Sequence, residues 1–398
     1  MSDAHAIKLK PHHDKRVALG HPWIFSNEIA DDVARLPPGG AVDVLDAAGR
    51  FLGRGYANPA SLISVRLLTR DAEDDIDHAD FYAKRIKAAL ALREVVVPGR
   101  RAYRLVASEA DFLPGLVVDR FEDVLAVQIH TLGIERRAEL VREALVSVLA
   151  PAGAALRNDA AVRLLEGLEQ SSGLWFGEVP ERVPFLAGHV AGRPLRLNAD
   201  VLGGQKTGFF FDQAENRAFA AARSAGSRVL DVYANTGAWA IGAMLGGARE
   251  AVAIEINPRT CELIEANAAL NGVAVSTVAS DARDAMAAMH ASNERFDAIF
   301  LDPPAFAKNR KKAGAALHAY REINRQALQI LHRGGLLYTS SCSFHILEER
   351  FQDEVLAAAR QAGRTLRQVR RGEQAPDHPV LPAIPESRYL KHHVYQAL

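Results

Sequence analysis

Cysteine is scarce in this sequence of 398 residues, and neither sign of charge is in excess. Only Cys261 and Cys342 occur, which argues against a disulfide framework and against a cysteine-based zinc cluster. Lys and Arg together number 48, as do Asp and Glu, so no overall field attracts nucleic acid. A local basic surface remains compatible with this balance. The N-terminal histidines have no carboxylate or cysteine at ligand spacing, so no metal is expected.

Long hydrophobic runs are missing as well. No stretch approaches the length of a charge-free membrane span, and the N-terminus carries no cleavable signal pattern. We therefore expect a cytoplasmic protein with no membrane partner. Hydrophobic residues make up 48% of the chain and charged residues 24%, as in globular proteins, and the length predicts more than one domain.

Three domains are expected. Residues 1–72 form a β-rich module with a hairpin signal around Ala47–Arg50, and the acidic run Asp71–Asp80 indicates the boundary that follows it. Residues 73–190 form a middle α+β domain with an expected helix at Glu135–Leu149. Its Arg100, Arg101 and Arg104 are either solvated loop residues or RNA contacts.

Strand and helix signals alternate in residues 191–398, which is typical of an α/β fold with a doubly wound parallel sheet. The strands are expected at Arg228–Tyr233, Ala251–Ile256, Val275–Ala279, Phe296–Leu301 and Gly335–Ser340, and near Leu366–Val369 and Tyr389–Leu398. The helices are expected at Ala238–Leu245, Pro258–Asn271, Ala282–His290 and Ala316–His332.

Carboxylates follow three successive strands of this half. Asp231 precedes a tight turn through Asn235 and Gly237, and this turn lacks the G-x-G-x-x-G pattern of dinucleotide sites. Glu255 can accept hydrogen bonds from two ribose hydroxyls, and Asp281 can accept one from an adenine amino group. Each acid alone could be a turn or cap residue. Together they predict an adenosyl ligand without phosphates.

The next two strands end in groups suited to chemistry. Phe296–Leu301 leads into Asp302-Pro303-Pro304, where the prolines force the backbone out of the sheet just after a carboxylate. The following strand leads to Cys342, which should lie beside Asp302. The basic run 308–312 is either a solvated loop or a contact for RNA phosphates, and affinity would then fall steeply with salt.

Residues 228–342 resemble a class I S-adenosylmethionine-dependent methyltransferase with a Rossmann-like fold. The resemblance implies S-adenosyl-L-methionine as the cofactor. It also implies cofactor-binding roles for the acids and turn residues named above and for a segment that helps to close the site. These residues are Asp231, Asn235, Gly237, Glu255, Asp281 and Asp302, with Phe209 and Asp212 in the upstream segment Gly204–Gln213.

Over nearly its whole length the chain is similar to the bacterial large-subunit rRNA cytosine-5 methyltransferase family, whose members carry an N-terminal PUA RNA-binding domain. The resemblance implies 23S rRNA as the partner, and homodimer formation is left open. Pro303, Pro304, Phe306, Lys308 and Lys311 are then expected to contact the RNA.

The expected catalytic residues are Cys342 and Asp302. A cytosine carbon 5 is too weak a nucleophile to take a methyl group directly, but it becomes enamine-like once a thiolate adds to carbon 6. Asp302 would bind the edge of the flipped base. Ala305 stands where many cytosine-5 RNA enzymes carry a second cysteine, so the base that removes the carbon 5 proton is unassigned. The alternatives are methylation of an exocyclic amine, with Phe306 stacked on the base, and a non-catalytic RNA-binding assembly protein.

Overall fold

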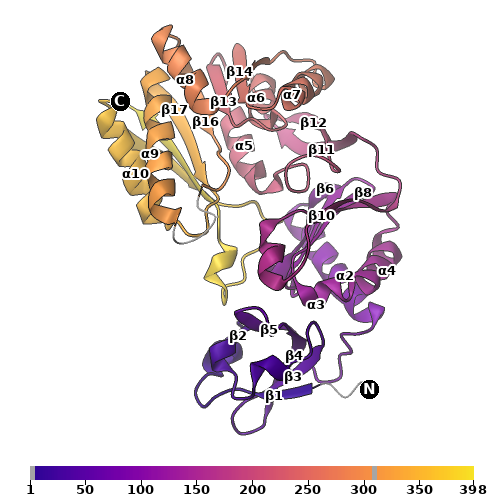
Figure 1. Cartoon of the computed structure of the whole chain (residues 1–398). Coiled ribbons are helices and arrows are strands. Elements are labelled where there is room, and N and C mark those ends of the chain that lie inside the picture. The colour runs from indigo at the N-terminus through magenta and orange to yellow at the C-terminus, as the bar shows by residue number, and fades with distance from the viewer. Residues whose placement is uncertain (1–4, 307–311) are drawn as a thin grey trace. The chain divides into compact units, whose positions relative to one another are not determined.

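The structure is a computed structural model that describes residues 5–306 and 312–398. They belong to two compact units. Unit 1 comprises Met1–Val183, Asp200–Phe209 and Pro376–Ser387, and unit 2 comprises Pro184–Ala199, Phe210–Ala375 and Arg388–Leu398 (Figure 1). The chain therefore passes from one unit to the other after residues 183, 199, 209, 375 and 387.

The first sheet of unit 1 has the strand order β1-β3-β4-β5-β2, in which only the pair β1 and β3 is parallel. Its strands are β1 (His5–Lys8), β2 (Trp23–Phe25), β3 (Ala41–Leu45), β4 (Phe51–Ala57) and β5 (Ile63–Thr69), and the short helix α1 spans Lys15–Ala18. Ile7, Ile24 and Val44 lie in its buried core. The expected hairpin is confirmed, whereas β1 and β2 are too short to show a sequence pattern.

The second sheet of unit 1 has the order β10-β9-β8-β7-β6. Its strands are β6 (Ala102–Ala107), β7 (Leu116–Phe121), β8 (Val124–Ile129), β9 (Gly153–Asn158) and β10 (Ser171–Gly177). The accompanying helices are α2 (Ala79–Val96), α3 (Leu132–Glu135) and α4 (Ala138–Leu149). The helix expected at Glu135–Leu149 is confirmed from Ala138 onward, whereas Glu135 ends the separate helix α3. Arg137 lies between the two helices with non-helical backbone angles (φ −108°, ψ 16°), and its buried side chain donates to the carbonyls of Gly39, Ile76 and Gly133.

Buried polar groups connect these two sheets. The Tyr56 hydroxyl in β4 donates to the Pro114 carbonyl at 2.7 Å and accepts from Thr131 Oγ1 at 2.8 Å. Arg66 in β5 pairs with Glu166 at 3.0 Å. Tyr56 belongs to the same hydrophobic cluster as the core of the second sheet, whereas most buried residues of the first sheet form a cluster of their own.

Unit 2 contains a seven-stranded sheet with the order β15-β14-β13-β16-β17-β19-β18. Its strands are β13 (Arg228–Val232), β14 (Glu250–Glu255), β15 (Ser276–Ala279), β16 (Phe296–Leu301), β17 (Leu331–Ser341), β18 (Leu366–Gly372) and β19 (Lys391–Ala397). The first five run parallel in space, and β19 is antiparallel to both of its neighbours. The predicted doubly wound sheet is confirmed.

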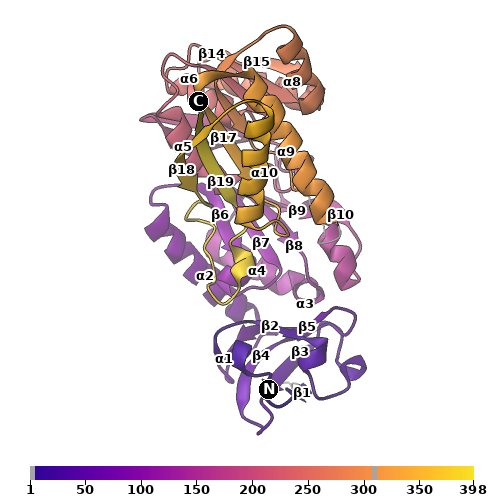
Figure 2. The same ribbon diagram turned by 90° about the vertical axis from the view of Figure 1, so that its left-hand side faces the viewer.

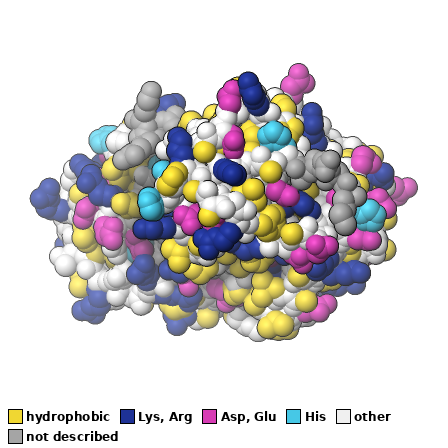
Figure 3. Space-filling view, turned by 90° about the horizontal axis from the view of Figure 1, so that it is seen from below, with side chains coloured by type: hydrophobic (Ala, Val, Ile, Leu, Met, Phe, Trp, Pro, Cys, Tyr) yellow, Lys and Arg dark blue, Asp and Glu magenta, His cyan; other side chains and the backbone are white. Residues whose placement is uncertain are grey.

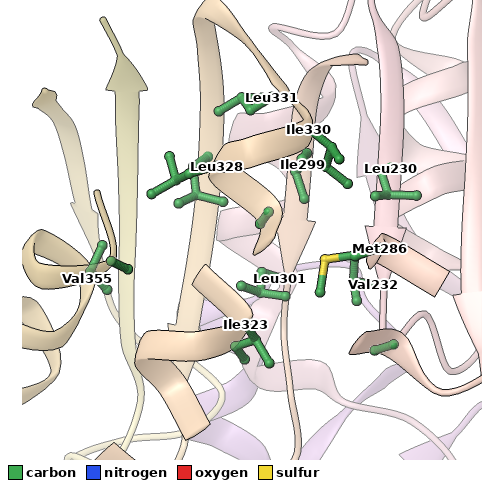
Figure 4. Packing of buried hydrophobic residues seen from close by; sticks show 14 of the residues in the cluster. Leu230, Val232, Met286, Ile299, Leu301, Ile323, Leu328, Ile330, Leu331 and Val355 are labelled. Atoms are coloured by element: carbon green, nitrogen blue, oxygen red, sulfur yellow. The ribbon is translucent and has the colours of Figure 1, made fainter. Parts of the chain in front are cut away.

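Helices cover both faces of this sheet. They are α5 (Ala214–Ala221), α6 (Ala238–Leu245), α7 (Pro258–Leu270), α8 (Ala282–Ala291), α9 (Ala313–Ile330) and α10 (Glu348–Gln361). On one face, Ile299 and Leu301 of β16 join the cluster formed with α8, α9 and α10 (Figure 4). On the other, Phe300 stacks on Trp239 of α6 at 5.4 Å between ring centroids. Alternate residues of a strand point to opposite faces, so a continuous apolar run fills both layers.

Helix α9 ends two residues earlier than its sequence pattern predicts. It stops at Ile330, and β17 begins at Leu331. Helix α10 lies next to α9 (Figure 2). Gly334, with φ +83°, lies within β17. A two-stranded hairpin, β11 (Val183–Val190) and β12 (Arg193–Ala199), comes before this fold in the chain.

Candidate active site

The strand order of unit 2 reverses between β13 and β16. The chain proceeds outward from β13 through β14 to β15, and then returns to β16 on the other side of β13. In open α/β sheets, ligands bind beyond the carboxyl ends of the strands at such a point. Asp231 lies near the carboxyl end of β13 and Asp302 directly follows β16. The two predicted acids therefore come to the same edge of the sheet.

Asp231 is fully buried, and its Oδ2 accepts a hydrogen bond from the Ala240 amide at 3.0 Å. Burial raises the pKa of Asp231 to about 8; the Ala240 amide lowers it and the nearby Asp302 raises it. Asn235 (φ +52°) and Gly237 (φ +76°) in the following turn have left-handed backbones. A Cβ on Gly237 would lie 2.7 Å from Ile264 Cγ2, so the turn requires glycine there.

Glu255 at the end of β14 completes this turn. Its Oε2 accepts from the Asn235 amide at 3.1 Å, and its side chain is buried. Within residues 5–306 and 312–398, Asp231 Oδ1 and Asn235 Oδ1 are buried without a hydrogen-bond partner. Buried polar atoms are normally satisfied, so these oxygens suit a ligand with donor groups, such as the amino end of S-adenosyl-L-methionine.

Asp281 has a structural role in addition to any ligand role. It is the N-cap of α8, where its Oδ1 accepts from the amides of Arg283 at 2.9 Å and Asp284 at 3.4 Å. Its side chain is 40% exposed. The cap interpretation that the sequence left open therefore applies to Asp281. Its contact with adenine stays a prediction.

Asp212 does not cap a helix. It lies in a 3₁₀ turn at Phe211–Gln213 without a side-chain cap, and its Oδ2 accepts from the Tyr389 hydroxyl at 2.7 Å. Phe209, predicted with it as a cofactor residue, is buried and belongs to unit 1.

Two residues that the sequence did not single out hold Asp302. Gln213 Nε2 donates to its Oδ1 at 2.9 Å, and Trp239 Nε1 donates to its Oδ2 at 3.4 Å. Gln213 also donates to Ser340 Oγ, which is hydrogen bonded to His392 Nδ1 at 2.9 Å. Burial, reinforced by the charge of Asp212, raises the pKa of Asp302 to about 6. The position of Gln213 within the upstream segment Gly204–Gln213 was the only sequence signal for this network.

The segment after Asp302 is only partly buried. Pro303 is buried, Pro304 is exposed, and Phe306 packs on Tyr320 of α9 with 4.8 Å between ring centroids. Lys308 and Lys311 lie outside the described residues. On the face of the molecule that Figure 3 shows, Lys and Arg side chains are interspersed with Asp and Glu.

Cys342 directly follows β17 and is partly exposed. Because β17 pairs with β16 up to Leu301 and Thr339, Cys342 and Asp302 leave adjacent strands at the same edge. The hydroxyls of Tyr320 and Ser343 are hydrogen bonded at 2.8 Å next to it. Cys261, by contrast, is buried in α7, as expected of a packing residue.

Two side chains of unit 1 lie against acidic partners. Arg104 is not a solvated loop residue, because it lies in β6 and pairs with the buried Asp119. Trp23 Nε1 donates to Glu109 at 2.9 Å, and Arg66 lies over the Trp23 ring. No group of three or more His, Cys, Asp or Glu side chains in the described ranges is arranged to hold a metal ion. No helix of the described ranges is long and apolar enough to cross a membrane.

The fold and the acid-lined strand ends define the class of S-adenosylmethionine-dependent methyltransferases. A Streptococcus mutans protein described as a SAM-dependent methyltransferase has the same fold, with a TM-score of 0.82 and 20% identity over 99% of this chain and 100% of that one. Family models match a PUA-like domain at residues 7–70 and "Conserved hypothetical protein 95" at residues 186–362.

Two relatives extend over almost the entire chain. Ribosomal RNA large subunit methyltransferase I of Tolumonas auensis is 36% identical over 98% of this chain and 99% of its own length. The protein of that name from Shewanella denitrificans is 38% identical over 97% of both. The chain belongs to the ribosomal RNA large subunit methyltransferase I family. The expected fold and family are confirmed, and both agree with S-adenosyl-L-methionine as the cofactor.

Proposed function

We propose that this chain methylates carbon 5 of a cytosine in 23S rRNA through a covalent adduct with Cys342. The observation that carries the proposal is the position of Cys342 at the end of β17, next to the strand that ends in Asp302. The names of the relatives support large-subunit rRNA as the substrate. The match to a PUA-like domain at residues 7–70 supports RNA binding by the N-terminal module.

The proposed cofactor site consists of the strand-end acids and the turn between them. Asp231, Asn235, Gly237 and Glu255 would hold S-adenosyl-L-methionine, with Asp281 at the adenine. When bound, the cofactor supplies the methyl group. The unpartnered oxygens of Asp231 and Asn235 within the described ranges support this assignment.

The chain's own residues account for activation of the base. The Cys342 thiolate adds to carbon 6 of the flipped cytosine and leaves carbon 5 nucleophilic. Asp302 holds the ring nitrogen at position 3. A carboxyl with a pKa of about 6 can deliver and recover a proton there near neutral pH. Gln213 and Trp239 fix both oxygens of that carboxyl, so its orientation is set before the base arrives.

Cofactor labelled in its methyl group tests the site of transfer. Incubation with 23S rRNA, digestion to nucleosides and chromatography should place the label in 5-methylcytidine. Label in an N-methyl nucleoside would instead support the second candidate, methylation of an exocyclic amine. That candidate is favoured by the Asp302-Pro303-Pro304 motif and by an aromatic residue, Phe306, four positions after Asp302.

Replacing the thiol tests the covalent step. Cys342→Ala should lower turnover at least about a thousandfold, because it removes the nucleophile itself. Cofactor binding, measured by calorimetry, should survive. Cys261→Ala is the matched control and should keep full activity. Undiminished turnover in Cys342→Ala would remove the thiol from the mechanism, and absence of cofactor binding in the wild type would favour the non-catalytic assembly protein.

The remaining predictions about the intact protein are part of this proposal. They are a cytoplasmic location and domain boundaries after residues 72 and 190. Homodimer formation stays open, and sedimentation of the purified chain distinguishes a monomer from a homodimer.

A further inference from the structure

A buried lysine lies beside the proposed nucleophile. Lys391 begins β19, and in the antiparallel pairing with β17 it is opposite Ser341, the residue before Cys342. Its side chain extends past that residue, since Nζ donates to the Ser343 carbonyl at 2.8 Å. Only 8% of Lys391 is exposed. The ammonium is thus held against the carbonyl of Ser343, the residue that follows Cys342.

Among the described residues, the acids around Lys391 leave its charge without a direct partner. The Ser343 carbonyl takes one of three ammonium hydrogens. Glu348 of α10 is engaged by Arg371 and lies 3.4 Å from His393 Nε2, and in the described ranges no carboxylate forms an ion pair with Lys391. A buried ammonium is costly unless an anion compensates it.

The groups facing Lys391 identify that anion. Burial lowers the pKa of Lys391 to about 8, while Cys342 and then Glu348 raise it. Tyr320 also faces the thiol, and burial raises the pKa of its hydroxyl, so it remains neutral. His393 is held neutral by burial, which lowers its pKa. The attraction between the two charges is mutual. Because the thiolate of Cys342 favours the charged form of Lys391, the ammonium of Lys391 favours the thiolate in turn.

We propose that Lys391 is a positioning residue that holds Cys342 in its ionised form, ready for attack. Sγ gives its proton to water, and the ammonium of Lys391, which keeps its own protons, compensates the negative charge of the thiolate that is left. The use of that thiolate in attack on cytosine rests on the proposed function. The ionisation of Cys342 itself does not depend on that function.

Alkylation of the thiol tests the inference without any RNA. In a Cys261→Ala background, Cys342 is the only cysteine. The rate of its reaction with iodoacetamide is followed from pH 5.5 to 9.5 by mass spectrometry, and the midpoint reports ionisation. Lys391→Met should move that midpoint up by about one to three pH units, because an opposite charge has been removed. Lys391→Arg retains the charge and should keep the midpoint within about half a unit.

Two results would overturn the proposal. One is a folded Lys391→Met protein, competent in cofactor binding by calorimetry, whose midpoint equals that of the wild type. The other needs no variant: a wild-type midpoint at or above about 8.5, the value of a free thiol. The outcome is separable from the proposed function. A shifted midpoint together with an active Cys342→Ala enzyme rejects only the covalent mechanism, and an unshifted midpoint with an inactive Cys342→Ala enzyme rejects only the role of Lys391.

Discussion

Asp231 and Asp302 lie at the same edge of the sheet, and there the pKa of each carboxyl group is raised. Both lie among buried neighbours and close to other acids, and the pKa of each is raised, to about 8 and about 6. An unfolded aspartate ionises near pH 4. Between these values the folded chain holds a proton that the unfolded chain has released. The folded form is therefore penalised as pH rises through this window.

Asp231→Asn isolates this effect. The wild-type free energy of unfolding should fall by up to about 1.4 kcal/mol per pH unit on account of Asp231 between about pH 4 and pH 8. The amide cannot ionise, and its oxygen can still accept from Ala240, so the variant should gain stability relative to the wild type as pH rises. Urea unfolding at pH 5 and pH 8 measures the difference. Asp281→Asn, at a partly exposed cap, is the control. Equal differences at both pH values for Asp231→Asn would contradict the assigned burial effect.

At the scale of elements, some boundaries are readable from the sequence and others depend on contacts made far along the chain. The structure gives β16 and α6 the predicted limits, because an apolar run stops at Asp302-Pro303 and Gly237 precedes the first helical residue. At the start of α4, by contrast, the side chain of Arg137 donates to a carbonyl 98 residues away, a contact that no local sequence pattern reveals. The same holds for Asp302: its position at a strand end was predictable, but its partners Gln213 and Trp239 come from other elements.

Helix α3 offers a prediction about packing between elements. A Cβ on Gly133 would lie 1.9 Å from Cγ of the Tyr56 ring, which two hydrogen bonds hold in place. Gly133→Ala should therefore separate α3 from β4 and lower the free energy of unfolding by about 1–3 kcal/mol. Gly314→Ala in α9 is the matched control, since nothing lies within 4 Å of its added Cβ. That change should be neutral or stabilising by up to about 1 kcal/mol. Chemical denaturation measures the free energy of unfolding of both variants and of the wild type. A Gly133→Ala protein as stable as the wild type would contradict the close contact.

At the scale of the whole molecule, an equal number of positive and negative side chains means that RNA binding must depend on local surfaces. The basic run 308–312 follows the Asp302 segment in the sequence. If it binds phosphates, Lys311→Glu with Lys312→Glu should weaken binding and reduce the slope of log affinity against log salt by about 0.7–0.9 for each phosphate that is no longer neutralised. Lys87→Glu, at an exposed position of α2, should leave that slope unchanged. RNA affinity is measured for each variant at several salt concentrations. A double variant with the affinity and the slope of the wild type would show that the run is a solvated loop.

The five passages of the chain between the two units have a consequence for synthesis on the ribosome. The buried side chain of Arg93 in unit 1 donates to the Asp377 carbonyl, 284 residues later, and the Arg104 amide donates to the side chain of the same aspartate. At a translation rate of about 5–20 residues per second, Asp377 is synthesised roughly 15–60 s after Arg93. Unit 1 is complete only when Pro376–Ser387 has been made, after most of unit 2, so a nascent chain that stalls before these residues exposes an unfinished unit 1.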